Sequence, residues 1–150
     1  MLNGLGLRKA FVFVKVYVGG LYLQNKSKDA NAIVNSDIPR SVLMKFVHDV
    51  DKPKMAEAWE TGMKNNLPAA AFPVVEARLK KMIGMISDVK EGDTMQMTYL
   101  PGKGTEIFQN GKLLGNIDGA DFATALFAIY LGPKPPSENI REGMLGGKCG

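Results

Sequence analysis

The segment over residues 2–23, LNGLGLRKAFVFVKVYVGGLYL, constrains the fold of this chain more than any other part of the sequence. It leads through two closely spaced glycines to a single arginine, Arg8, and then to a long apolar run. Residues 11–18 alternate valine with Phe, Lys and Tyr, a composition that is typical of β-strands. Because both faces of this run are largely apolar, we predict a strand that is covered on both sides and continues through a glycine pair to Leu23.

Arg8 lies at the start of this run, and any functional interpretation depends on its partner. Burying a guanidinium group costs several kcal/mol unless the group is paired and hydrogen-bonded. Two kinds of partner remain open at this point. One is an internal Asp or Glu, and the other is a ligand carboxylate or phenolate, which the planar guanidinium binds through two N–H groups.

Hydrophobic periodicity and turn signals predict the remaining elements. In the first part of the chain we expect a short helix from Ser27, a strand over 40–47, a helix capped by Asp51 and a helix from about Ala69. A three-stranded meander over 94–117 follows, and a short helix from Ser137 comes last. Between these two we expect a buried helix that is opened by Asp118, with Asp121 in capping-box position, and ended by Gly132. Helices segregated beside a largely antiparallel sheet make the fold class α+β. No linker or repeat divides the 150 residues, so we predict a single domain over 1–150.

Composition argues against several classes of protein. The net charge is +4, but the basic residues are scattered rather than clustered, so we expect no nucleic-acid partner. No apolar run approaches the roughly 20 residues that span a bilayer, so we expect no integral membrane segment. His48 is the only histidine and Cys149 the only cysteine, which leaves no set of residues for a metal site or a disulfide.

Trp59 is the most informative of the apolar side chains in the predicted helices. It lies four residues from both Met55 and Met63, so the three mark one face of a helix. Phe72 lies on the apolar face of the next helix, and Phe122 lies in the apolar helix near the C-terminus. Core packing and the lining of a cleft are both compatible with this spacing.

Several of these segments resemble the chalcone isomerase superfamily, and in particular its bacterial chalcone isomerase-like branch. The matching motifs are LNGxGxR over 2–8, KVYVGGLYL over 15–23, AEAWETG over 56–62, the long segment 99–132, and MLGG over 144–147. The resemblance implies an open-faced β-sandwich, in which a layer of helices packs on a long antiparallel sheet with a ligand cleft between them. It also implies that an upstream edge strand or a secretion signal lies outside this sequence. If a secretion signal has been removed, the protein is expected in the periplasm; without such a signal, it is expected in the cytoplasm.

The same resemblance bears on catalysis. In the superfamily's enzymes the arginine of the motif holds the substrate phenolate, and Arg8 matches it. Two threonines of the enzymes fall on Tyr17 and Ile129, the helical region holds no match for the water-orienting tyrosine, and its asparagine partner corresponds to Asn65 or Asn66. Losing hydroxyls that polarise the substrate ketone removes the electrostatic stabilisation that the reaction needs. We therefore predict that the chain does not cyclise chalcones.

The leading hypothesis is a non-catalytic protein that binds an apolar anionic ligand, a fatty acid, without a cofactor. Arg8 pairs with the ligand carboxylate and Tyr17 donates a second hydrogen bond. Under this hypothesis the apolar part of the ligand is lined by Trp59, Met63, Phe72 and Phe122.

Three alternatives remain open. In the first the protein binds haem, with Arg8 on a propionate and His48 or a tyrosine as axial ligand. In the second it is an isomerase, an intramolecular lyase for a chalcone-like enone, with Arg8 as its catalytic residue. In the third its role is structural or partner-binding, and Arg8 is ion-paired internally. The sequence does not indicate an oligomeric state.

Overall fold

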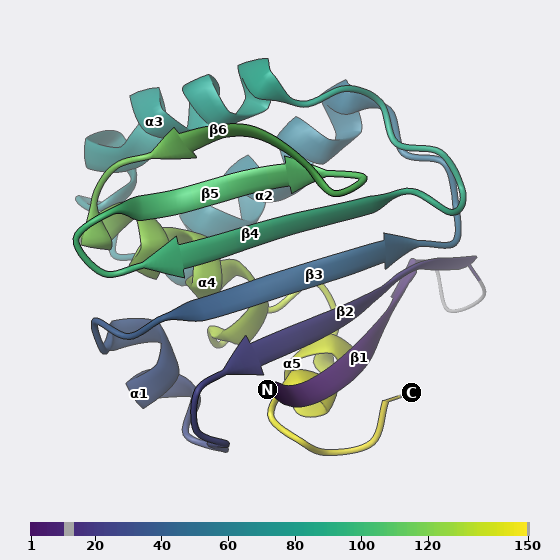
Figure 1. The fold of residues 1–150 in the computed structure, drawn as a ribbon, viewed down its shortest axis with the longest axis horizontal. Coiled ribbons are helices and arrows are strands. Elements are labelled where there is room, and N and C mark those ends of the chain that lie inside the picture. The colour runs from purple at the N-terminus through teal and green to yellow at the C-terminus, as the bar shows by residue number, and fades with distance from the viewer. Residues whose placement is uncertain (11–13, 150) are drawn as a thin grey trace.

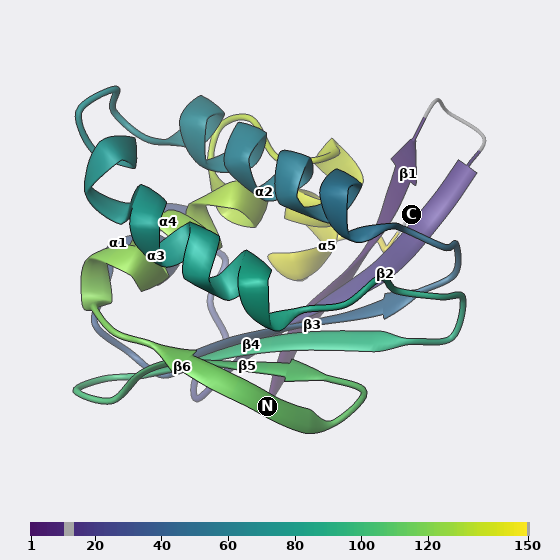
Figure 2. The same cartoon turned by 90° about the horizontal axis from the view of Figure 1, so that it is seen from above.

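The computed structural model describes residues 1–10 and 14–149, which form one antiparallel sheet with helices packed on one of its faces (Figure 1 and Figure 2). The six described strands lie in chain order across the sheet. The strands are β1 (Leu2–Ala10), β2 (Val14–Leu23), β3 (Arg40–Phe46), β4 (Thr94–Leu100), β5 (Gly104–Gln109) and β6 (Lys112–Ile117). The helices are α1 (Ala30–Asn35), α2 (Lys52–Asn66), α3 (Phe72–Met85), α4 (Ala120–Leu131) and α5 (Glu138–Met144). The predicted α+β class, with helices layered on a long antiparallel sheet, is confirmed.

The N-terminal segment differs from its prediction in two ways. Residues 2–10 form a strand of their own, β1, whereas the sequence pattern indicated only a glycine-rich lead-in. The predicted strand is observed as β2 from Val14, while its first residues, 11–13, lie outside the described residues. The prediction that this strand is covered on both sides is wrong, because the helices pack on only one face of the sheet (Figure 2).

Gly4 and Gly6 lie within β1 because α5 crosses it at very short range. A Cβ atom on Gly4 would lie 1.9 Å from the carbonyl oxygen of Gly143 in α5. A Cβ atom on Gly6 would lie 2.6 Å from the Cα atom of Ile140 in the same helix. The two glycines therefore form a contact surface for the C-terminal helix, and α5 in turn supports the strand that carries Arg8.

Helix α2 begins as predicted, with the Asp51 side chain accepting a hydrogen bond from the Lys54 backbone N–H at 2.9 Å. In its middle, Gly62 permits close packing against α4. A Cβ atom there would lie 2.7 Å from Cγ2 of Ile129. This contact fixes the position of α2 above the sheet.

Helix α4 is almost fully buried, as its apolar composition predicts. Its predicted capping box is wrong. The N-cap residue is Gly119, which has a positive φ of 105° and no capping side chain, so Asp118 lies outside the helix. Asp121 instead forms a bidentate ion pair with Arg78 of α3, with distances of 2.7 and 2.8 Å. Within the described residues, no helix is long and apolar enough to cross a membrane.

Candidate ligand-binding cleft

A β-bulge between β1 and β2 sets the geometry of the site. Arg8 pairs with Tyr17, but the next pair is Lys9 with Lys15, which leaves Val16 as an extra residue on β2. Residues directly opposite each other in an antiparallel pair share a face of the sheet. Arg8 and Tyr17 therefore lie together on the face that the helices cover, and the bulge turns Val16 toward the same side.

A cleft of about 680 Å³ lies between this part of the sheet and α2. Such a volume suits a small-molecule ligand. Its floor is formed by Arg8, Val16 and Tyr17, with Met44 and Phe46 from β3. The rings of Tyr17 and Phe46 pack against each other with their centroids 5.4 Å apart. The remaining lining residues come from Val50, from α2 (Lys54, Met55, Glu57, Ala58, Trp59, Thr61, Gly62, Asn65), from α4 (Ile129, Tyr130) and from the loop after it (Lys134, Pro135, Pro136).

The charges in this cleft are mainly positive. Arg8, Lys54 and Lys134 line it, and Glu57 is the only carboxylate among the described lining residues. Arg8 donates one hydrogen bond from Nη1 to the Lys9 carbonyl. None of the ion pairs formed by residues 1–10 and 14–149 includes Arg8. The guanidinium group therefore retains N–H donors for an incoming anion.

Tyr17 places a hydroxyl group beside that guanidinium. The residue is 7% exposed, and none of the described residues forms a hydrogen bond with its hydroxyl. Burial raises the pKa of Tyr17 well above its ordinary value, the nearby Tyr130 raises it further, and Arg8 opposes the shift. Tyr17 is therefore a neutral hydrogen-bond donor near pH 7.

Tyr130 is a second buried tyrosine in the cleft, and it was not among the residues predicted for the site. Its hydroxyl accepts a hydrogen bond from the Trp59 indole N–H at 3.2 Å and lies 3.6 Å from the Met44 sulfur. Burial raises its pKa, and the bond from Trp59 partly opposes the shift. A tyrosine in an otherwise apolar helix could have indicated a polar group inside the core, because a buried phenol normally finds a hydrogen-bond partner.

The structure separates the predicted lining residues into two groups. Trp59 lies at the cleft with Arg8 and Tyr17. Met63, Phe72 and Phe122 are buried in the core and are absent from the described residues that line the cleft. Helical spacing predicted their burial but could not identify the cavity, which borders Met55 and Trp59 on the same face of α2 without reaching Met63.

The two candidate asparagines have different environments. Asn65 lines the cleft. The Asn66 side-chain amide donates to the carbonyl groups of Gly62 and Lys134, both at 2.8 Å, and its oxygen accepts from the Lys134 backbone N–H at 2.7 Å. Asn66 therefore fixes the loop that carries Lys134 to the end of α2.

His48, the axial ligand considered for haem, lies elsewhere. It is exposed, its Nδ1 atom is 2.7 Å from the Asp49 carbonyl oxygen, and it is not one of the described cleft residues. Among the described residues, no cluster of three or more His, Cys, Asp or Glu side chains is arranged to hold a metal ion.

Comparisons with known proteins agree with this architecture. Residues 1–146 match a family model described as chalcone isomerase-like. Among solved structures, the chain is similar to a fatty-acid binding protein of Arabidopsis thaliana, with a TM-score of 0.77 and 18% sequence identity, over 96% of this chain and 85% of that one. At this identity the structural similarity shows the fold alone. A comparison with curated proteins found no match.

Proposed function

The chain belongs to the chalcone isomerase-like family, and we propose that it binds a fatty acid in its cleft without acting on it as an enzyme. One observation carries the proposal. Arg8 and Tyr17 lie opposite each other on the helix-covered face, and neither the guanidinium nor the hydroxyl has a described side-chain partner. A carboxylate between them accepts two N–H groups from Arg8 and one O–H from Tyr17.

The rest of the cleft suits an acyl chain. Its α2 wall runs from Lys54 to Asn65, a length of about 16 Å along the helix axis. Apolar groups, including Phe46, Trp59 and Ile129, provide most of the cleft surface that an acyl chain would contact. The fatty-acid binding function of the similar Arabidopsis protein supports an apolar ligand of this kind.

The residue at position 129 supports a binding role over catalysis. The resemblance assigns a polarising threonine of the enzymes to this position. Here it is Ile129, which lines the cleft and packs closely against Gly62. An isoleucine offers no hydroxyl to stabilise negative charge on a substrate ketone.

Native mass spectrometry of the protein purified from cells tests this proposal. We expect a co-purified acyl chain in the wild type and its loss in Arg8→Ala. Arg78→Ala is the matched control, because it removes an arginine whose ion pair with Asp121 lies outside the cleft, and it should retain the ligand.

Three results would contradict the proposal. An empty wild-type protein that also fails to bind added fatty acid removes its basis. Chalcone turnover above the spontaneous rate, lost in Arg8→Ala, favours the isomerase alternative. A Soret band on haem titration that disappears in His48→Ala favours the haem alternative.

A further inference from the structure

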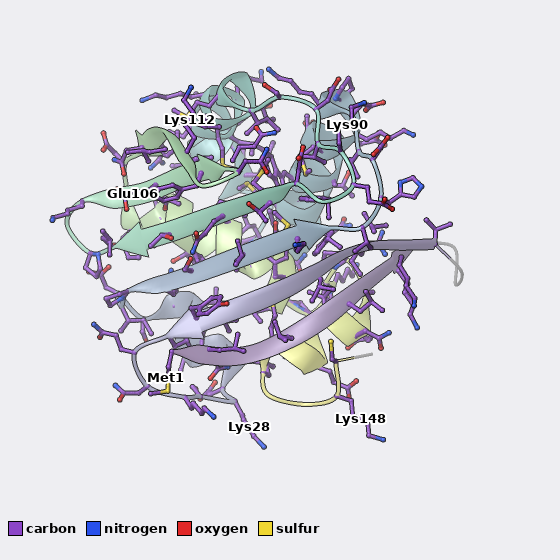
Figure 3. The ribbon with its side chains drawn as sticks, turned by 45° about the vertical axis from the view of Figure 1, so that its right-hand side comes forward. Met1, Lys28, Lys90, Glu106, Lys112 and Lys148 are labelled. Carbon is purple, nitrogen blue, oxygen red and sulfur yellow. The ribbon has the colours of Figure 1, made fainter. Side chains whose placement is uncertain are left out.

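The face of the sheet opposite the helices, which is turned toward the viewer in Figure 3, carries an apolar cluster over β1 and β2. A Cβ atom on Gly20 would lie 3.1 Å from Leu5, 3.3 Å from the Tyr22 ring and 3.5 Å from Leu2. A Cβ atom on the neighbouring Gly19 would instead meet Met144 and Tyr17 on the helix-covered side. The side chains of Leu2, Leu5 and Tyr22 therefore gather on the helix-free side, where Leu2 and Leu5 are 38% and 39% exposed.

Three half-buried residues extend this cluster across the first three strands. Leu7 pairs with Val18 between β1 and β2, and Leu43 of β3 pairs with Gly20. We call the set the outer apolar patch; it consists of Leu2, Leu5, Leu7, Val18, Tyr22 and Leu43. It ends at β4, where the Ser41 hydroxyl of β3 lies 2.8 Å from the Thr98 hydroxyl and accepts a hydrogen bond from the Gln96 side-chain amide at 3.0 Å.

Lysines border one end of the outer apolar patch. Lys9 follows Arg8, which faces the helices, so Lys9 and its cross-strand partner Lys15 lie on the helix-free face. Exposed Lys45 pairs with Val18 on the same face. Like charges directly opposite each other, as in Lys9 and Lys15, destabilise a sheet, so an anionic surface brought to this face would relieve their repulsion.

The charge of this part of the molecule has one sign. Residues 1–28 contain five basic residues and no acidic residue. Glu106 of β5 is the only acidic residue in the six described strands, and Figure 3 shows it well away from Met1 and the first strands. The partner of this face must therefore be anionic and must also accept apolar side chains.

We propose that the outer apolar patch and its three lysines dock the protein on an anionic lipid surface. The apolar side chains enter the boundary between headgroups and acyl chains, and the lysines pair with lipid phosphates. A second copy of the chain is a poor occupant, because its corresponding face brings lysines and no carboxylate from β1–β3. This inference does not depend on a ligand in the cleft.

Co-sedimentation with vesicles of phosphatidylcholine alone, or with added phosphatidylglycerol, tests the docking surface. We expect binding to the anionic vesicles, little binding to the neutral ones, and weakening by salt. Each lysine near an anionic membrane strengthens binding about fivefold, so Lys9→Glu/Lys15→Glu should weaken it about 25-fold or more. This variant keeps a like-charged pair at the same positions, so its folding should be little changed. Lys80→Glu/Lys81→Glu, exposed on α3, makes the same change in net charge and should bind nearly as the wild type does.

A second variant tests the apolar part of the surface. Val18→Thr keeps the shape of the side chain and should weaken vesicle binding at high salt, where the lysines are screened. Thermal melting verifies that the variants are folded. Equal weakening by the two double lysine variants, equal binding to neutral vesicles, or no binding at all would overturn the proposal. Recovery of an acidic protein through Lys9 and Lys15, with vesicle binding insensitive to them, would overturn it in favour of a protein partner.

Discussion

At the residue scale, recognition of the ligand head depends on Tyr17 as well as on Arg8. Tyr17→Phe removes one hydrogen-bond donor and keeps the ring that packs against Phe46. A hydrogen bond to a charged group contributes about 1.5–3 kcal/mol, so fatty-acid affinity should fall about tenfold or more in calorimetric titration. Tyr22→Phe makes the same change on the opposite face and should bind normally. Equal affinities for the wild type, Tyr17→Phe and Tyr22→Phe would show that Tyr17 does not bind the ligand.

The two buried tyrosines of the cleft also determine how the stability of the fold depends on pH. Burial raises the pKa of both Tyr17 and Tyr130 in the folded state, so folding favours their protonated forms. The stabilisation is fully present below about pH 10, where an unfolded tyrosine begins to ionise, and is lost as pH rises above it. Urea unfolding between pH 8 and 11 should show this loss. Tyr17→Phe should show a smaller loss, and an identical pH profile would contradict the assignment.

At the element scale, the contact between α5 and β1 supports the Arg8 strand. A Cβ atom on Gly143 would lie 1.9 Å from the Leu5 carbonyl oxygen, so Gly143→Ala must displace α5. Overpacking of this kind costs about 1–3 kcal/mol, and ligand affinity should fall with it. Gly84→Ala is the matched control within a helix, because no atom lies within 4 Å of its added Cβ. It should stabilise the protein by about 0.5–1 kcal/mol. Equal melting temperatures for Gly143→Ala and Gly84→Ala would contradict the close contact between α5 and β1.

The same contact shows what the sequence could and could not predict. The meander, the α2 cap and the buried α4 helix followed from local patterns of turns and periodicity. The prediction for Gly4 and Gly6 was wrong because these glycines are needed for close contact with a helix that lies more than 130 residues away in the sequence. Asp121 was misread because its partner, Arg78, comes from another helix. Local signals identify elements, whereas close contacts and ion pairs depend on how the elements are assembled.

At the scale of the whole molecule, the C-terminal segment connects the two sides of the cleft. Helix α5 rests on Gly4 and Gly6 of β1, the strand that carries Arg8, and the loop before α5 carries Lys134 and is held to α2 by Asn66. The Ser137 hydroxyl, 3.5 Å from the Leu7 carbonyl oxygen, adds a contact between this segment and β1. The width of the cleft therefore depends on interactions between both ends of the chain and its middle.

Asn66 is the residue that tests this connection. Asn66→Ala removes the two bonds to the Lys134 backbone and the bond to Gly62, so the loop should detach from α2. We expect a loss of about 1–3 kcal/mol in the free energy of unfolding, together with weaker fatty-acid binding. Asn35→Ala is the matched control, because its amide also donates to the carbonyl four residues earlier, that of Asn31, but reaches no loop. Unchanged affinity in a destabilised Asn66→Ala protein would show that the loop does not shape the site. A parallel loss of affinity in Asn35→Ala would show that binding follows stability alone.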